Sequence, residues 1–359
     1  MASVLPLEEA LPARDLQDDA QDVPDAGSLA RPGFRTRHPA VAFLIRRVAA
    51  GLATLLVATM LIFAAVEVLP GNVASVVLGR NATPARVAAL QSDLHLNESL
   101  PTRYVHFLGN LVTGHLGDSS AALAQGATLP VWQVIRDPLR NSLVLAVLTI
   151  IIYVPLCLLL GTVAGLFAGR RTDHAISLSA LSVGAMPEFL IGTLLIVIFF
   201  TKLNLLPPVS QIAPGQTPFS HPTALILPVC TLLLVSTAFG TRLVRASVVE
   251  VLREDYVAMA RLNGQPERRV ILRYTLRNAL GPGIQALAQT VQYLIGGIIV
   301  TESVFDYPGI GNKLVQAVSV RDVQEIAVIA AILATVYVFT NILADLAVML
   351  AVPKLRTQA

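Results

Sequence analysis

The fold is decided by residues 254–282, EDYVAMARLNGQPERRVILRYTLRNALGP, a basic loop between two long apolar segments. The flanking segments are 222–243 and 283–304, and about 20 apolar residues suffice for a helix to cross ~30 Å of hydrocarbon. Two membrane helices joined by a charged loop place that loop at the membrane surface. There the protein can meet a partner protein or lipid headgroups.

The composition extends this prediction to the whole chain. Hydrophobic residues make up 54% of the sequence and charged residues only 14%, which is typical of a polytopic membrane protein. Backbone hydrogen bonding in lipid permits only helices or closed barrels, and the alternation of a barrel strand is missing. We therefore predict an all-α bundle of six spans. They are 48–69, 141–168, 175–200, 222–243, 283–304 and 323–352.

The positions of basic residues predict the orientation of the bundle. Arginine and lysine gather before the first span, after the second, in the 254–282 loop and at the chain end, and such ends are usually cytoplasmic. Both termini are thus expected inside, with the segments 70–140, 201–221 and 305–322 on the outer side. Besides those of the loop, the residues used are Arg46, Arg47, Arg170, Arg171, Lys354 and Arg356.

The first forty residues differ from the rest of the chain. They hold seven acidic residues and four arginines, a composition that predicts a disordered acidic cytoplasmic tail ahead of a membrane domain at 41–356. No cleavable signal peptide is evident.

Several residues within the spans are interpreted as packing residues. Gly161, Gly165 and Gly169 recur every four residues, which lets a neighbouring helix approach closely. Cys157 and Cys230 lie in different spans without paired or metal-ligand spacing.

The sequence lacks the motifs of a phosphate-binding loop, a zinc site and a hydrolase nucleophile. None of the three lysines closes a phosphate-binding G-x-x-x-x-G-K-[ST] loop, and neither a zinc motif nor a G-x-S-x-G turn occurs. We expect no cofactor or metal on this chain, no nucleic-acid partner and no enzymatic site. Any energy for work must come from another protein.

Polar residues inside the spans are costly unless they face the bundle interior or a wet cavity. Gln285, Gln289, Gln292 and Gly296 share one face of the fifth span. This stripe either lines a translocation path or forms hydrogen bonds between packed helices.

Two acidic residues also lie in apolar surroundings. Glu188 falls near the middle of the third span, next to Pro187, which can break the helix and admit water. Two interpretations of Glu188 remain open: a functional carboxylate, and a solvated structural one. For Asp345, nearer the cytoplasmic end of the sixth span, structural pairing is favoured.

The basic loop itself divides into two predicted short helices. The first covers 256–263 and ends at Gly264, and the second begins at Pro266 and Glu267. The second carries Arg269, Arg273 and Arg277 and is expected at the membrane surface. From the residues alone, a docking helix and a plain amphipathic connector remain open.

The loop resembles the cytoplasmic coupling loop of ABC-importer permeases of the dipeptide, oligopeptide and nickel branch. The family pattern is close to DYVRTARAKG followed by LRNALIP, and this chain reads DYVAMARLNG at 255–264 and LRNALGP at 276–282. Further similar motifs occur in order. They are VEVLPG at 66–71, LHLN at 94–97, GHLGDS at 114–119, RLVRASVVEVLREDY at 242–256 and TESVFDYPGIG at 301–311.

This resemblance implies a type I ABC-importer permease fold and a set of partners. A second homologous permease would complete the pathway, and cytoplasmic ATP-binding subunits would hold ATP and Mg and grip a coupling loop at 250–282. An extracytoplasmic solute-binding protein would deliver the substrate, with short peptides favoured, across a bacterial inner (plasma) membrane. The segment 70–140 would dock that protein or shape the outer vestibule.

The resemblance also implies roles for individual residues, in three groups. Coupling to the ATPase falls to Asp255, Tyr256, Ala258, Ala260, Arg261 and Gly264. The translocation path would be lined by Gln285, Gln289, Gln292 and Glu302, and a structural turn formed by Pro308, Gly309 and Gly311. Glu188 is added to the path because of its position within the third span.

The chain departs from the family pattern at some positions, and one rival class stands beside the resemblance. Leu262 and Asn263 replace Ala-Lys before the loop glycine, and His115 replaces the aspartate of GDLG. The rival is a secondary transporter or channel driven by an ion gradient, with Glu188 as its proton or ion site.

Overall fold

The computed structural model describes residues 39–67, 78, 82–93, 98–213 and 215–351, and their regular structure is helical. Residues 1–38 of the predicted tail and the motif residues 68–71 and 94–97 lie outside the described residues, whereas residues 39 and 40 already belong to the first helix. The α-helices are α2 (Pro39–Glu67), α4 (Pro84–Asp93), α5 (Leu100–Thr113), α6 (Ser120–Ala124), α7 (Val131–Leu166), α8 (Arg171–Gly184), α9 (Glu188–Ile196), α10 (Pro222–Leu252), α11 (Asp255–Leu262), α12 (Glu267–Arg269), α13 (Arg277–Val304), α14 (Ile310–Val320) and α15 (Val323–Ala351). Two π-helical segments, η2 (Val197–Lys202) and η4 (Val270–Leu276), and the 3₁₀ turn η3 (Pro218–Ser220) complete the order.

The described residues confirm the predicted all-helical membrane fold. Five helices are long and apolar enough to cross a membrane, and α8 with α9 and η2 forms a sixth candidate if this bent pair counts as one span. The five are Ala42–Ala65, Val131–Leu166, Pro222–Leu252, Glu267–Val304 and Val323–Met349.

Two predicted segments differ from the structure. The third span was expected as one helix over 175–200, but the chain bends by 100° between α8 and α9. Pro187 explains the break, because proline lacks the N–H of a helical residue and disfavours helical backbone at the residue before it. The second span begins ten residues earlier than predicted, at Val131, so α7 takes up the last part of the segment 70–140.

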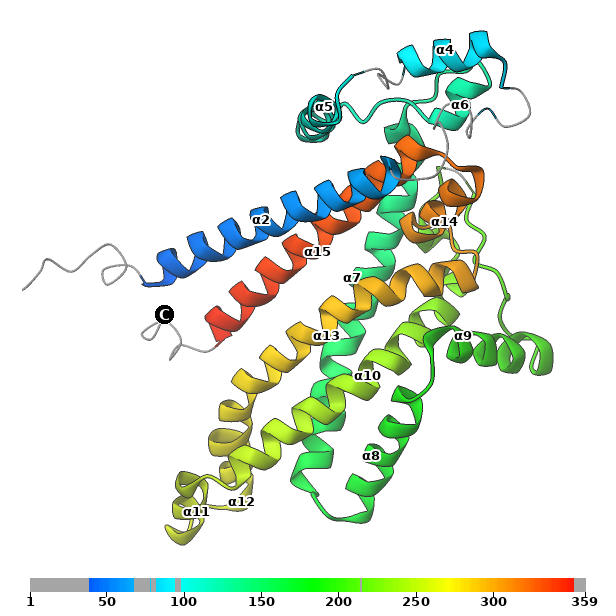
Figure 1. The fold of residues 1–359 in the computed structure, drawn as a ribbon. Helices are drawn as coiled ribbons and strands as arrows, with labels where there is room; N and C mark the ends of the chain where they lie inside the picture. Colours follow the sequence, from blue (N-terminus) through cyan, green and yellow to red (C-terminus); the bar gives the residue numbers. More distant parts are fainter. Residues whose placement is uncertain (1–38, 68–77, 79–81, 94–97, 214, 352–359) are drawn as a thin grey trace, which may run out of the picture.

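The core of the bundle lies where α10 packs between α7 and α13 (Figure 1). Glycines allow the closest approach of α7 to α10. A methyl group on Gly161 would lie 2.6 Å from Cβ of Val244, and one on Gly165 would lie 2.7 Å from Cβ of Val248. The predicted packing role is confirmed for these two glycines. Gly169 instead has a φ of 79° in the turn before α8, and no atom of a described residue lies within 4 Å of a methyl group there.

Replacing Gly161 by Ala is expected to destabilise the bundle by about 1–3 kcal/mol, because the added methyl group overpacks this contact. Denaturant titration of the purified protein in mixed micelles measures the change. Gly109→Ala in α5 is the matched control, since no described residue has an atom within 4 Å of a methyl group there. Equal stability of the two variants would contradict the close packing of α7 on α10.

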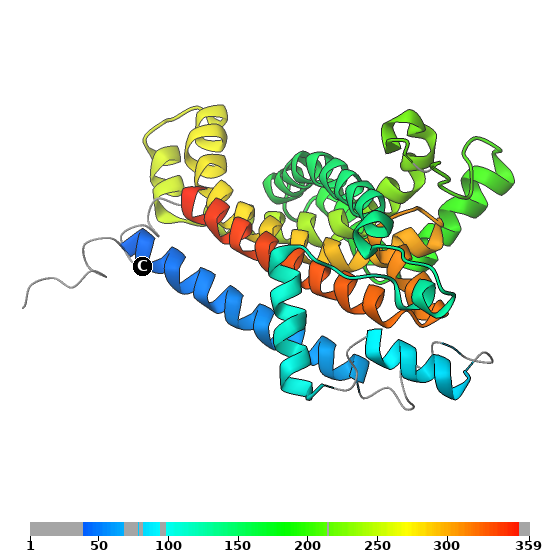
Figure 2. The ribbon, with the colours of Figure 1, turned by 90° about the horizontal axis from the view of Figure 1, so that it is seen from above.

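At the other edge of the bundle, α2 lies alongside α15 (Figures 1 and 2). Arg47 of α2 and Asp345 of α15 form an ion pair, which confirms structural pairing for Asp345. The outer helix α5 is attached to α2 by Tyr104, whose hydroxyl donates to the carbonyl of Leu56 at 3.1 Å and whose ring lies 5.6 Å from that of Phe63. The segment between the first two spans therefore rests partly on the first span.

Candidate functional site

The basic loop forms a separate short helix, α11, beyond the end of α10 (Figure 1). The helix ends in a Schellman turn: the N–H of Gly264 donates to the carbonyl of Arg261 at 3.0 Å, and the N–H of Gln265 donates to that of Ala260 at 3.1 Å. Gly264 has a φ of 71°, a conformation that glycine adopts without steric cost. The predicted stop of the helix at Gly264 is confirmed.

The two faces of α11 differ in what they contact. Val257 and Ala260 are buried and join a core cluster with Val251 and Val270. On the opposite side Tyr256, Met259 and Leu262 are exposed, with 59% of Met259 and 80% of Leu262 accessible. An apolar row at spacings of three residues on a solvent-facing helix is a surface suited to a partner protein.

Most of the predicted coupling residues lie on the accessible side of this loop. Asp255, Tyr256, Ala258, Arg261 and Gly264 are exposed. Ala260 differs, because its methyl group faces the chain's own core. Sequence reasoning also missed Met259 and Leu262, although their spacing from Tyr256 carried the signal.

Arg261 already has a partner within the loop. Its Nη2 donates to Oε1 of Glu267 at 2.9 Å and its Nε to Oε2 at 3.3 Å, so the planar guanidinium holds the carboxylate with two bonds. The hydrogen bond to Glu267 raises the pKa of Arg261. This pair joins the end of α11 to the start of α12 and fixes the loop's shape.

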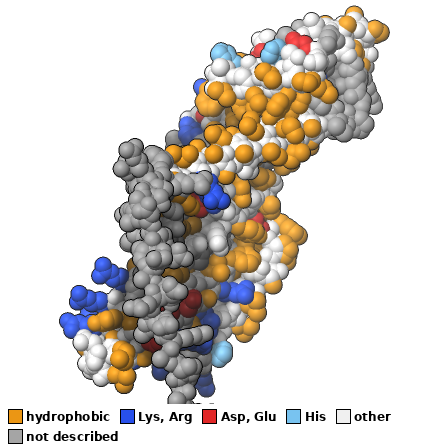
Figure 3. All heavy atoms as spheres, turned by 60° about the vertical axis from the view of Figure 1, so that its left-hand side comes forward, with side chains coloured by type: hydrophobic (Ala, Val, Ile, Leu, Met, Phe, Trp, Pro, Cys, Tyr) orange, Lys and Arg blue, Asp and Glu red, His pale blue; other side chains and the backbone are white. Residues whose placement is uncertain are grey.

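The second predicted loop helix is not a separate short helix. The helix that begins at Glu267 continues through η4 into α13, so that one element runs from Glu267 to Val304. The exposed Arg269, Arg273 and Arg277 lie on its first part. Figure 3 shows Lys and Arg side chains gathered at the lower end of the molecule, where Figure 1 places α11 and α12.

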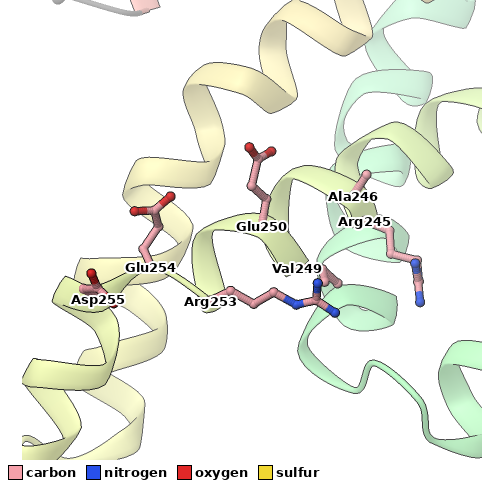
Figure 4. A pocket seen from close by; sticks show the side chains of 7 residues that line it. All are labelled: Arg245, Ala246, Val249, Glu250, Arg253, Glu254 and Asp255. Carbon is pink, nitrogen blue, oxygen red and sulfur yellow. The ribbon is translucent and has the colours of Figure 1, made fainter.

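A polar hollow of about 530 Å³ lies where α10 meets α11 (Figure 4). Side chains of both signs line it, including Arg253, Glu250 and Asp255. Arg245, at its edge, donates from Nη2 to Oδ2 of the buried Asp173 at 2.7 Å. This ion pair attaches α8 to the end of α10, next to the hollow.

The glutamine stripe lies on an accessible face of α13. Gln285 and Gln289 are exposed, and Gln292 is half-buried. Gln292 and Gly296 line a cavity of about 450 Å³ together with Glu188 from the start of α9. The broken third span thus brings Glu188 to the stripe.

Glu302 lies apart from that face and is fully buried. Its Oε2 accepts from the N–H groups of Gly311 at 2.7 Å and Asn312 at 3.2 Å, and its Oε1 accepts from the hydroxyl of Ser142. The carboxylate therefore caps the first turn of α14, where backbone N–H groups lack helical partners.

The turn at Pro308, Gly309 and Gly311 is shaped by this carboxylate. A methyl group on Gly309 would overlap the carboxylate of Glu302, and one on Gly311 would lie 2.7 Å from Cα of Ile299. Only glycine fits at these two positions. Glu302 and the turn form one structural unit.

The fold and these sites define a helical, multi-pass membrane protein with an exposed loop helix and polar residues on one span. The family model described as binding-protein-dependent transport system inner membrane component matches residues 157–357. A model of the N-terminal part of such components matches residues 40–146. The chain belongs to this family of ABC-transporter permease components.

Curated relatives agree with this family. A probable peptide ABC transporter permease of Sinorhizobium fredii is 33% identical over 317 residues, 88% of this chain and 99% of the relative. The glutathione transport system permease GsiC of Pectobacterium atrosepticum is 34% identical over 85% of this chain and 95% of its own length. A putative peptide permease of Brucella ovis is 31% identical over 88% of this chain and 98% of its own length.

Proposed function

We propose that this permease works in a bacterial inner membrane as one of two similar subunits that enclose a path for short peptides. Cytoplasmic subunits bind ATP and Mg and hydrolyse the ATP, and an extracytoplasmic solute-binding protein delivers the cargo. Both termini and α11 lie on the cytoplasmic side. The positive-inside distribution of arginine supports this orientation.

The coupling role is inferred from the exposed apolar face of α11. This helix is fixed at both ends. Its buried face holds it against the ends of α10 and η4, and the Arg261–Glu267 pair closes the turn after it. A partner that moves Tyr256, Met259 and Leu262 thus moves α10 and α13 with them. Closure of the ATPase subunits would in this way rock the spans between inward-facing and outward-facing states.

The cargo is proposed from the relatives and from the polar face of α13. Two of the relatives are described as peptide permeases and one as a glutathione permease. Amide side chains such as Gln285, Gln289 and Gln292 offer both donors and acceptors, which a peptide backbone requires. We assign these glutamines and Glu188 to the path.

Gentle purification of the tagged full-length chain from its native membrane tests this function. Mass spectrometry is expected to find a second permease and an ATP-binding subunit in stoichiometric amounts. The control is a variant with Tyr256, Met259 and Leu262 replaced by Ser, which should retain the second permease and lose the ATP-binding subunit. Recovery of the wild-type chain alone, with transport intact after reconstitution, would favour a secondary transporter instead.

A further inference from the structure

The cavity beside Glu188 is lined by side chains that could select one chemical group of a transported solute. It measures about 450 Å³ and lies between α9, α13 and α15. Besides Glu188 and Gln292, its lining residues include Tyr293 from α13 and Tyr337 from α15. A carboxylate, an amide and two aromatic rings therefore come together from three helices.

The Glu188 carboxylate lies close to the backbone of α13 at Gly297, where no side chain is in the way. A methyl group on Gly297 would lie 2.5 Å from Oε1 and 2.7 Å from Oε2 of Glu188. The carboxylate thus lies directly against α13, where a larger residue would displace it. It makes no hydrogen bond or ion pair with another residue of the described part of the chain.

Within a membrane span, a carboxyl group without a cationic partner is costly to ionise, and a positively charged ligand would stabilise its anionic form. Among positively charged ligands, Tyr293 and Tyr337 favour an ammonium group, because aromatic faces attract such groups. Tyr293 is braced by Phe239 of α10, with ring centroids 5.6 Å apart. Zinc and calcium take several protein ligands, whereas Glu188 is the one carboxylate among the described residues lining the cavity.

We propose that Glu188, Gln292, Tyr293 and Tyr337 form a subsite for an ammonium group of the transported solute. The carboxylate neutralises the charge, the Gln292 amide oxygen accepts a hydrogen bond, and the rings cover the cation. The subsite rests on the proposed function, since an importer of peptides carries molecules with free amino groups. It makes Glu188 a specificity residue of the path.

Saturation-transfer NMR on the purified complex in nanodiscs, without the binding protein, tests the subsite. The probes are dialanine, which has an N-terminal ammonium, Nα-acetyl-lysine, which has only a side-chain ammonium, and N-acetyl-dialanine, which has neither. We expect saturation transfer to dialanine, to Nα-acetyl-lysine or to both, and none to N-acetyl-dialanine. Which of the first two probes responds shows which ammonium group is bound. Glu188→Gln should weaken that binding about tenfold or more, the value of a charged hydrogen bond.

A backbone variant separates this role from general folding. Gly297→Ala should displace the carboxylate and lower the signal. Gly283→Ala on the same helix should not, because in the described part of the chain no atom lies within 4 Å of a methyl group there. The proposed subsite would be refuted if all three probes were equally saturated, or if neither ammonium probe were saturated. Unchanged binding in Glu188→Gln would refute it as well. ATP-dependent uptake by the same complex tests the importer function separately, so the two failures are distinguishable.

Discussion

Replacing Gly264 by Asp should lower ATP-dependent transport about 100-fold, the loss that a displacement near 1 Å produces in a positioned assembly. The φ of 71° at this residue costs a non-glycine residue about 1–2 kcal/mol. An acidic side chain is also unfavourable at the negative end of the helix dipole. The turn after α11 would shift, and Tyr256, Met259 and Leu262 would no longer fit their partner.

ATP hydrolysis and peptide uptake are measured together in proteoliposomes containing the assembled complex. Uptake per ATP should fall, while circular dichroism and the elution volume match those of the wild type. Gly264→Asn is the matched control, because asparagine tolerates left-handed backbone and adds no charge. It should retain more transport than the aspartate variant. Wild-type uptake in Gly264→Asp would refute the coupling role of this turn.

Removal of the Glu302 carboxylate should be among the most damaging changes to the fold. Glu302→Ala leaves the N–H groups of Gly311 and Asn312 buried without an acceptor, and each such group costs about 1–3 kcal/mol. The empty space left by the side chain adds to this loss. We expect a decrease of about 3–5 kcal/mol in the free energy of unfolding.

Denaturant titration in mixed micelles measures this loss. Glu302→Gln should be milder, because its amide oxygen can still accept from Gly311 and Asn312. If Glu302→Ala were as stable as the wild type but defective in uptake, the carboxylate would belong to the path, as the family resemblance implies. The buried position of Glu302 favours the structural result.

Local patterns in the sequence predicted the elements well. Runs of apolar residues gave the spans, and Gly264 marked the end of α11, because both depend on residues adjacent in the chain. The contact of Gly161 and Gly165 with a neighbouring helix also followed from their four-residue spacing. The family motifs added the class of protein.

Features that depend on distant residues were harder to predict. The inward direction of Ala260 depends on Val251 and Val270, which pack against α11 from both flanking helices. The capping role of Glu302 depends on how α14 folds back after the turn at Pro308. Glu188 and Gln292 line one cavity next to the 100° bend between α8 and α9, and Pro187 gave only a local signal for that bend.

ATP-dependent uptake of a labelled dipeptide into proteoliposomes tests whether this permease takes part in peptide import. The vesicles contain this chain with its co-purified subunits, and the binding protein is added on the cargo side. We expect uptake with ATP and Mg, none with a non-hydrolysable ATP analogue, and none when this chain is omitted. Uptake driven by an ion gradient without ATP, and lost in Glu188→Gln, would refute the importer function and identify a secondary transporter.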